Sequence, residues 1–290
     1  MRALLKDGPR VGVVDVGEPA LAAEDDVLVR VVRAGICRTD VYAAEGRLSC
    51  KERVVLGHEL AGVVVGHGTR ARAMGVAAGD RVTVDPRKTG GFPGVDRDGA
   101  FAELMVVPAA AIVRLPRDLP FEVGAYVEPV AAALAVLEAG LSRAARGVVY
   151  GDGRISLLTH AVLLAHGFER VERVEEGPLP ADTYDFAVET SATTAALREL
   201  VGALRARGTL VLKSRPASSP ELNVRELVMK ELTLRGVAYG SFEDAVALLA
   251  GGRLALSEHF GATFPLERFA EAFAASTARG ARKVFLTLEA

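Results

Sequence analysis

The chain has 290 residues, half of them apolar, and its 35 Lys and Arg nearly balance 37 Asp and Glu, for a formal net charge of −2. This length and composition predict about two globular domains, and the balanced charge argues against nucleic acid or an anionic membrane as a partner. Cys37 and Cys50 are too few for a disulfide-stapled secreted domain or a four-thiolate structural zinc site. With no signal-type apolar stretch near Met1 and no apolar run of 18 residues, we expect a cytoplasmic protein without a membrane partner.

The N-terminal part of the chain predicts a β-rich, barrel-like module. Short Val-rich runs alternate here with Gly, Asp and Pro, a pattern typical of strands and tight turns. The expected strands lie at residues 11–17, 26–36, 54–68, 79–86 and 99–108.

After Pro120 the composition shifts toward Ala and Leu, and strands alternate with helices. Helical periodicity is present in residues 121–141, 154–167 and 194–208. Strands are expected at 147–151, 170–176, 184–190, 209–214 and 232–240. This alternation predicts parallel βαβ units, and two helical stretches with a final strand at 283–289 are expected to follow.

Three side chains in the β-rich part have the chemistry of a metal site. Cys37 lies 21 residues before His58, and Glu59 follows directly. A thiolate, an imidazole and a carboxylate are ligands that a catalytic Zn²⁺ takes when one position stays open. The alternative is that Cys37 is a small buried apolar residue and His58 a hydrogen-bonded core histidine.

A glycine-rich turn, residues 151–156 (GDGRIS), follows an expected strand and opens an expected helix. Gly151 and Gly153 would let the backbone approach a pyrophosphate at the helix N-terminus, and Ser156 stands where a third glycine is usual. Glu175 comes 24 residues after Gly151, near the spacing at which an acid receives the adenosine ribose hydroxyls. The alternative for Glu175 is a solvated charge in a charged run.

Taken together, these motifs resemble the medium-chain, zinc-dependent alcohol and polyol dehydrogenases. The resemblance covers nearly the whole chain in the family's order, through GICRTD, LGHELAGVV, GDRV, DGAFAE, EPVA, GDGRIS, YDFAVETSAT, GTLVL, KELTLRG and FPLERFAEAF. It implies an α/β protein with a GroES-like β-rich catalytic domain and a shortened Rossmann-type doubly wound parallel sheet. The implied catalytic domain is residues 1–127, completed by 240–290, and the implied dinucleotide-binding domain is 128–239.

The resemblance assigns a metal-site role to each motif residue. Cys37 and His58 would hold one catalytic zinc, and Glu59 and Glu128 would complete its ligand shell or exchange within it. Asp40 is similar to the acid that orients the zinc-bound imidazole. With so few cysteines, we expect one zinc per chain.

The resemblance also implies how substrate and cofactor are used. Thr39 matches the hydroxyl that takes the substrate proton, and Arg38 the position that in some relatives contacts the cofactor diphosphate. A carboxylate at Glu175 would repel a 2′-phosphate, so NAD(H) is expected over NADP(H). Residues 230–240 resemble the family's edge strand, which implies a homodimer.

The sequence departs from the family pattern at several points. Residues 87–97 (RKTGGFPGVDR) stand where many relatives carry a lobe with four cysteines, and only nine residues separate Glu175 from Asp185, too few for a further βα unit. Tyr42 stands where many relatives have a relay histidine, and Ser156 replaces a glycine.

These features leave two hypotheses of different classes. The first is a zinc- and nicotinamide-dependent dehydrogenase of a secondary alcohol, polyol, sugar-like or amino-alcohol substrate, or of the matching ketone. The second is an eroded family member that no longer cycles a nicotinamide and acts as a binding or regulatory protein, or in zinc-dependent non-redox chemistry. The retained metal residues favour the first, and the shortened dinucleotide half is the reason to weigh the second.

Overall fold

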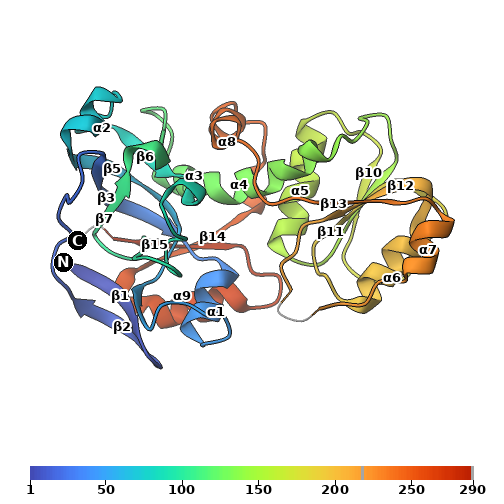
Figure 1. Ribbon diagram of the computed structural model, residues 1–290, viewed down its shortest axis with the longest axis horizontal. Coiled ribbons are helices and arrows are strands. Elements are labelled where there is room, and N and C mark those ends of the chain that lie inside the picture. The colour runs from blue at the N-terminus through green and yellow to red at the C-terminus, as the bar shows by residue number, and fades with distance from the viewer. Residues whose placement is uncertain (217–218, 289–290) are drawn as a thin grey trace. The chain divides into compact units, whose positions relative to one another are not determined.

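The computed structural model describes residues 1–216 and 219–288, and the chain separates into two compact units (Figure 1). The first unit comprises Met1–Glu128, Val246–Gly251 and the residues from Leu256 on. The second comprises Pro129–Ala245 and Gly252–Ala255. Helices α4 (Val127–Leu134) and α8 (Phe242–Ala250) each include a point where the chain passes from one unit to the other.

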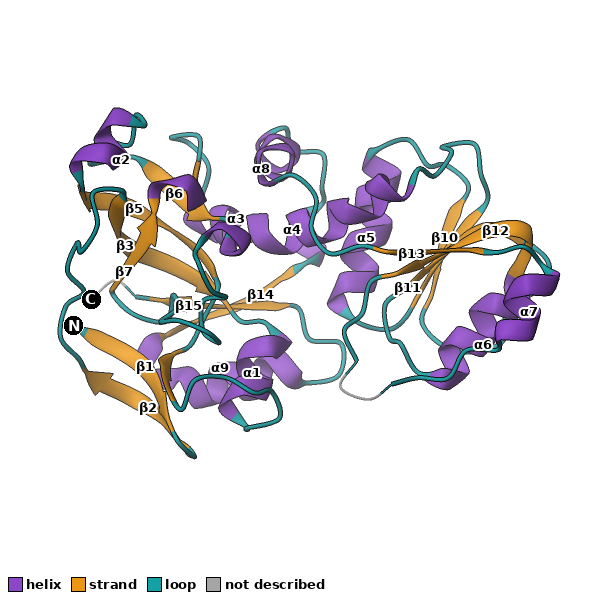
Figure 2. Ribbon diagram, viewed as in Figure 1, coloured by secondary structure: helices purple, strands orange, loops and turns teal. Residues whose placement is uncertain are grey.

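The first unit is built mainly of β-strands, as its Val-rich runs predict (Figure 2). Its larger sheet has the order β14-β15-β3-β5-β6-β8, with β7 also paired to β3, and a smaller sheet has the order β2-β1-β4. The strands are β1 (Arg2–Asp7), β2 (Arg10–Asp15), β3 (Asp26–Gly35), β4 (Arg53–Val55), β5 (Glu59–His67), β6 (Arg81–Val84), β7 (Leu104–Pro108), β8 (Ile112–Arg114), β14 (Phe260–Pro265) and β15 (Lys283–Thr287). The helices are α1 (Arg38–Ala44), α2 (Thr69–Ala73), α3 (Phe121–Ala125) and α9 (Phe269–Thr277).

The core of the first unit lies along β3. Its alternate residues Val27, Val29 and Val31 are fully buried, because side chains alternate between the two faces of a strand. They belong to one apolar cluster with Leu60 of β5 and Phe101.

One expected strand of this unit is interrupted. Residues 54–68 form not one strand but two, β4 and β5, which belong to different sheets. The chain turns at Gly57, whose φ of 98° is in a region that residues with a side chain rarely adopt. A Cβ at Gly57 would also lie 2.4 Å from the ring of Phe101. Because of this break, His58 lies immediately before the first residue of β5.

The second unit is a five-stranded parallel sheet with the order β10-β9-β11-β12-β13. Its strands are β9 (Gly147–Tyr150), β10 (Val171–Val174), β11 (Tyr184–Glu189), β12 (Leu204–Leu212) and β13 (Thr233–Gly236). Its helices include α5 (Arg154–Ala165), α6 (Thr194–Ala203) and α7 (Val224–Met229). The expected α/β class, with a β-rich module and a short doubly wound parallel sheet, is confirmed.

Helices cover both faces of this sheet. Val148 of β9 packs with Leu200 of α6 in one apolar cluster, whereas Val149 packs with Leu163 of α5 in another. Consecutive residues of β9 thus point to opposite layers, which explains why the strand is apolar without interruption.

Helix α6 is shorter than its periodicity predicts. The expected helix 194–208 ends at Ala203, and β12 begins at Leu204. The Lys230 ammonium donates to the carbonyls of Val201, Gly202 and Leu204 at 2.9 to 3.0 Å, which satisfies the end of the helix. The prediction of a longer helix was wrong because its end depends on a distant lysine.

The connection from β10 to β11 is a loop. Residues 175–183, all of them described, contain neither helix nor strand, as their number predicts. Leu179 packs into the apolar cluster on the α6 face of the sheet. The Tyr150 hydroxyl donates to the carbonyl of Gly177 at 3.1 Å and accepts from its N–H at 3.0 Å. This loop therefore links β10 to β11, which lie on either side of β9, without a helix or strand of its own.

Strand β15 ends at Thr287, and residue 289, the last of the expected final strand, lies outside the described residues. Among the described helices, none combines the length and the apolar character needed to cross a membrane.

Candidate active site

Three metal-ligating side chains meet in the first unit. Ligand atoms of Cys37, His58 and Glu59 all lie within 4.8 Å of one another. Cys37 caps the start of α1 directly after β3, and Glu59 begins β5, so the antiparallel β3–β5 pair brings the two together. His58 and Glu59 are buried, and Cys37 is partly exposed. The residues that the sequence proposed as ligands from distant positions are therefore neighbours.

Asp40 fixes the orientation of two members of this cluster. Its Oδ1 lies 3.0 Å from His58 Nδ1, and its Oδ2 accepts a hydrogen bond from the Cys37 backbone N–H at 2.8 Å. Burial opposes protonation of the imidazole, but Asp40 and then Cys37 outweigh it and raise the pKa of His58 well above its usual value in the metal-free protein. With Nδ1 directed at Asp40, Nε2 is the nitrogen left to bind a metal.

The buried carboxylate of Glu59 has a buried cationic partner. Lys283 on β15 is ion-paired with Glu59 Oε2, and its ammonium also donates to the Ile36 carbonyl at 3.1 Å. Burial raises the pKa of Glu59; Lys283 opposes this effect and the nearby Glu128 adds to it. Lys283 was not predicted from the sequence, where its only signal is a lysine that opens an apolar strand.

Glu128 lies near Glu59 but is not one of the residues whose ligand atoms come within 4.8 Å of one another. It is buried in the first turn of α4, and its charge raises the pKa of Glu59. Among the described residues, only Cys37, His58 and Glu59 form a group whose ligand atoms come within 4.8 Å. Glu59 is thus the carboxylate that the structure places next to the thiol and the imidazole.

The other proposed residues of this motif lie on α1. Thr39 Oγ1 is 3.6 Å from Cys37 Sγ, and Arg38, the first residue of the helix, is exposed. Tyr42 packs its ring under the guanidinium of Arg47, 4.2 Å from the ring centre. The hydroxyl of Thr39 is therefore next to the cluster, and Tyr42 is engaged with a surface arginine.

The donor set fits a zinc ion. One thiol, one imidazole and one carboxylate converge on a buried point, and the imidazole is already oriented through its other nitrogen. Thiolate sulfur, imidazole nitrogen and carboxylate oxygen are the ligand types that zinc takes, and three protein ligands leave a position open for substrate, whereas Ca²⁺ and Mg²⁺ take oxygen ligands. The site therefore suits zinc by ligand type, burial and orientation.

The glycine-rich turn of the second unit fits a dinucleotide phosphate. Gly151 has a φ of 140°, and a Cβ there would lie 2.2 Å from Thr190 Oγ1. Gly153 caps α5, and a Cβ there would meet no atom within 4 Å, so its outer side is open. Ser156 is fully buried, and its hydroxyl has no hydrogen-bond partner among the described residues. An open glycine at a helix N-terminus is the arrangement that accepts a phosphate.

Glu175 follows the last residue of β10 and is mostly solvent-exposed. Its carboxylate is ion-paired with Arg173 at 2.9 Å. The structure thus places both a carboxylate and a guanidinium at the end of the strand where an adenosine ribose binds in this type of sheet.

Glu189, at the end of β11, was also missed by sequence reasoning. It is fully buried and accepts hydrogen bonds from the backbone N–H groups of Ala192, Lys213 and Ser214. It ties together the loops that leave β11 and β12. A glutamate closing an otherwise apolar strand was the available signal.

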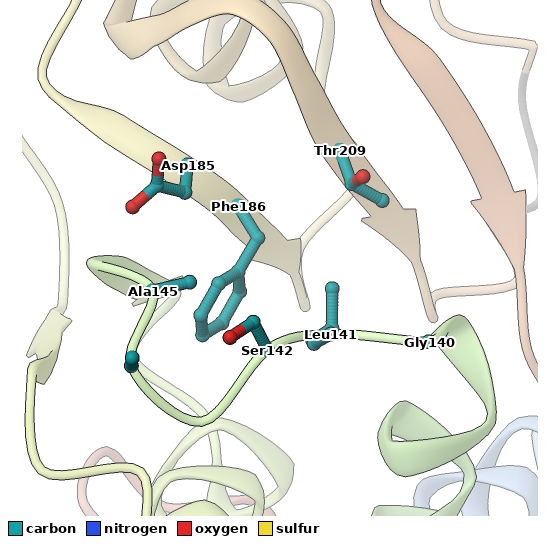
Figure 3. A pocket seen from close by; sticks show the side chains of 8 residues that line it. Gly140, Leu141, Ser142, Ala145, Asp185, Phe186 and Thr209 are labelled. Atoms are coloured by element: carbon teal, nitrogen blue, oxygen red, sulfur yellow. The ribbon is translucent and has the colours of Figure 1, made fainter.

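A hollow of about 400 Å³ lies elsewhere on the second unit (Figure 3). Asp185 and Phe186 near the start of β11 line it, together with the loop that precedes β9. Ligands of open α/β sheets bind at the carboxyl ends of the strands, and this hollow is near the amino end of β11. Asp185 already accepts from the Arg146 N–H at 2.7 Å and pairs with Arg205 at 3.0 Å. The hollow is therefore not the dinucleotide site.

The chain is similar in sequence and in fold to known dehydrogenases. The sequence profile of the alcohol dehydrogenase GroES-like domain matches residues 23–117. The chain is 28% identical to an L-threonine 3-dehydrogenase of Ruegeria pomeroyi, covering 99% of both chains, and 27% identical to a D-xylulose reductase of Morganella morganii, covering 94% of this chain and 96% of that one. Its fold matches a Sinorhizobium meliloti 1021 protein, provisionally described as a zinc-binding dehydrogenase and solved with NADP, with a TM-score of 0.88 at 24% identity over 99% and 98% of the two chains.

Proposed function

Because the chain belongs to the medium-chain dehydrogenase/reductase superfamily, of the zinc-dependent alcohol and polyol dehydrogenase type, we propose that it transfers a hydride between a nicotinamide cofactor and a secondary alcohol, polyol, sugar-like or amino-alcohol substrate. The convergence of Cys37, His58 and Glu59 within 4.8 Å carries the proposal. By their names, the similar proteins named above act on L-threonine, which carries a secondary alcohol next to an amine-bearing carbon, and on D-xylulose, a keto sugar; both support this substrate range.

Cys37 and His58, with Glu59 or Glu128, would hold the zinc. The ion would act as a Lewis acid toward the alcohol and ease its deprotonation. The chain supplies the rest of the proton chemistry. Thr39 Oγ1, next to the Cys37 thiol, is the group we assign to accept the alcohol proton. Asp40 keeps His58 Nδ1 engaged, so that the imidazole stays oriented.

Cofactor binding is assigned to the glycine-rich turn. Gly151, Gly153 and the N-terminus of α5 would hold the diphosphate, with Ser156 packing against the sheet behind it. The nicotinamide would supply the hydride acceptor or donor. We propose that NAD(H) is preferred over NADP(H). The Glu175 carboxylate would accept hydrogen bonds from the ribose hydroxyls and repel a 2′-phosphate. Arg173, the cation that could attract such a phosphate, is ion-paired with Glu175.

A homodimer through β13 is part of the same proposal. All four residues of β13 are exposed, and in the described sheet it pairs only with β12. Val228 and Met229 of the adjoining α7 are 68% and 70% exposed. A second copy that pairs along β13 would cover this bare edge and its apolar neighbours.

Zinc content and cofactor turnover test the proposal together. We expect one zinc per chain, saturable NADH binding, and NAD⁺-dependent oxidation of a polyol or amino alcohol that stops when zinc is chelated. A Cys37→Ala variant is expected to lose both zinc and activity. Folded, zinc-loaded protein that binds neither NADH nor NADPH at millimolar concentration would instead support the binding or non-redox alternative, which the similar proteins named above do not support.

A further inference from the structure

An aromatic ring from outside the motifs lies against the metal-binding histidine. The ring centroids of Phe92 and His58 are 4.9 Å apart, with the planes inclined by 51°. Phe92 belongs to residues 87–97, the segment that, by the family resemblance, stands where many relatives carry a lobe with four cysteines. We propose that Phe92 is a positioning residue that holds the His58 imidazole in its zinc-binding orientation, an inference that rests on the proposed function.

The imidazole is held on two sides. Asp40 Oδ1 engages the edge of the ring at Nδ1, 3.0 Å away, and Phe92 packs against the ring from another direction. His58 is only 2% exposed, so protein atoms enclose its ring. Rotating the ring away from Cys37 would break the Asp40 contact or displace Phe92. Both contacts therefore favour one orientation of Nε2.

The segment that carries Phe92 is rigidly cross-linked. Asp96 Oδ2 accepts from the Phe92 N–H at 2.8 Å, and the Phe92 carbonyl accepts from the Asp96 N–H at 2.8 Å. The Arg97 guanidinium donates to the carbonyls of Thr89 and, at 2.8 Å, Val106. This network holds the backbone from which the Phe92 ring projects, so that the ring starts from a fixed position when it packs on the imidazole.

The same segment is docked on the backbone that leads into His58. A Cβ at Gly94 would lie 2.7 Å from the Gly57 nitrogen, and one at Gly99 would lie 2.0 Å from the Gly57 oxygen. The Ala100 N–H donates to the Gly57 carbonyl at 2.9 Å. The two glycines permit this close approach, so Phe92 and His58 are fixed relative to each other through both side chain and backbone.

The inference predicts faster zinc loss when the ring is removed. Partners that orient a metal-bound histidine change metal affinity by about 10- to 100-fold when they are mutated. We expect Phe92→Ala to release zinc to a chromophoric chelator about tenfold faster than the unmodified protein. Phe92→Tyr, which keeps the ring, is expected to restore the slow rate.

Phe269→Ala is the matched control. Phe269 is a half-buried ring of the first unit that packs on its apolar core and on Phe273, with the two ring centroids 5.9 Å apart. Its removal takes a partly buried phenylalanine ring from the first unit, as Phe92→Ala does, but Phe269 has no ring contact with His58 among those the structure records. Zinc release from Phe269→Ala is therefore expected at the unmodified rate, and an acceleration equal to that of Phe92→Ala would overturn the positioning role in favour of general loosening.

A second readout does not need the metal. In zinc-free protein the Phe92 ring current is expected to shift the His58 ring-proton resonances, and Phe92→Ala should abolish this shift while Phe269→Ala preserves it. If Phe92→Ala fails to fold, Arg97→Met loosens the segment while keeping the ring, and its zinc release should also accelerate. An unchanged rate in Arg97→Met would then count against the proposal.

The outcomes separate this inference from the proposed function. Unmodified protein that takes up zinc and oxidises alcohols, but whose Phe92→Ala variant releases zinc at the same rate, overturns the role of Phe92 alone. Unmodified protein that cannot be loaded with zinc overturns the proposed function and this inference together.

Discussion

Gly35 and Glu59 are paired across β3 and β5, and Gly35 leaves the space in which the Glu59 carboxylate lies. A Cβ at position 35 would stand 2.2 Å from Glu59 Oε2 and 2.7 Å from Lys283 Cε. Neither atom can retreat freely, because Glu59 and Lys283 are both buried. A single glycine thus makes room for the ion pair beside the candidate zinc site.

Replacing Gly35 by Ala is expected to displace the Glu59 carboxylate. Overpacking of a filled interior costs about 1 to 3 kcal/mol, so the urea midpoint should fall and zinc content per chain should drop below one. Gly12→Ala is the control, since a Cβ there meets nothing within 4 Å. A Gly35→Ala protein with full zinc and an unchanged midpoint would contradict the role given to this glycine.

Tyr150 links the turn that begins at Gly151 to the shortened loop. Its hydroxyl makes two hydrogen bonds with Gly177, and each such bond contributes about 0.5 to 1.5 kcal/mol. If the loop forms part of the adenine side, Tyr150→Phe should raise the NADH dissociation constant by roughly 2- to 10-fold and leave zinc content unchanged. Calorimetric titration measures this.

Tyr184→Phe is the control for that experiment. Tyr184 belongs to the same apolar cluster as Tyr150, but its hydroxyl donates a hydrogen bond to Glu172 and not to the loop. Equal weakening of NADH binding in both variants would show a general loss of packing. Unchanged binding in Tyr150→Phe would remove the loop from the cofactor site.

Tyr184 also predicts a pH dependence of stability. Burial, then the hydrogen bond to Glu172 and its charge, raise the pKa of Tyr184 to about 12. An unfolded tyrosine ionises near about pH 10. The stabilisation is therefore fully present below pH 10 and is lost as the pH rises toward 12, since the unfolded chain releases the proton first.

Two measurements check this dependence. When phenolate absorbance is followed against pH, one tyrosine should ionise near pH 12. This transition should be missing in Tyr184→Phe. The free energy of unfolding should fall less steeply between pH 10 and 12 in the variant. The same steep fall in both proteins would assign the dependence to other groups.

Local periodicity and motif chemistry predicted much of this protein, because both act over short stretches of chain. The alternation of strands and helices in the second unit follows from residues that are neighbours in sequence. The end of α6 does not, because it depends on Lys230 reaching three carbonyls. The break at Gly57 was missed because the run around it is apolar on both sides, although its glycine and histidine were visible.

The surroundings of the candidate metal site were harder to predict than its ligand types. Cys37, His58 and Glu59 have recognisable ligand chemistry. Lys283 does not belong to their motif, and it comes from a strand near the end of the chain. Its ammonium donates to the carbonyl of Ile36, 247 positions earlier in the sequence. No local pattern encodes that contact. Phe92 lies in a segment without periodicity, so only the folded chain shows its ring on His58.

The dimer proposal gives the last prediction. Leu234→Pro removes a backbone donor from the edge strand, and Val228→Asp places a charge in the apolar surface beside it. Both variants are expected to run as monomers at micromolar concentration in light scattering, whereas the unmodified protein runs as a dimer. Met74→Asp is the control, because Met74 is an equally apolar, 52% exposed residue of the first unit, and it should stay dimeric. A buried aspartate without a partner destabilises an apolar interface by several kcal/mol. A Val228→Asp variant that stays dimeric would therefore place the interface elsewhere. Unmodified protein that is monomeric would show that there is no such dimer.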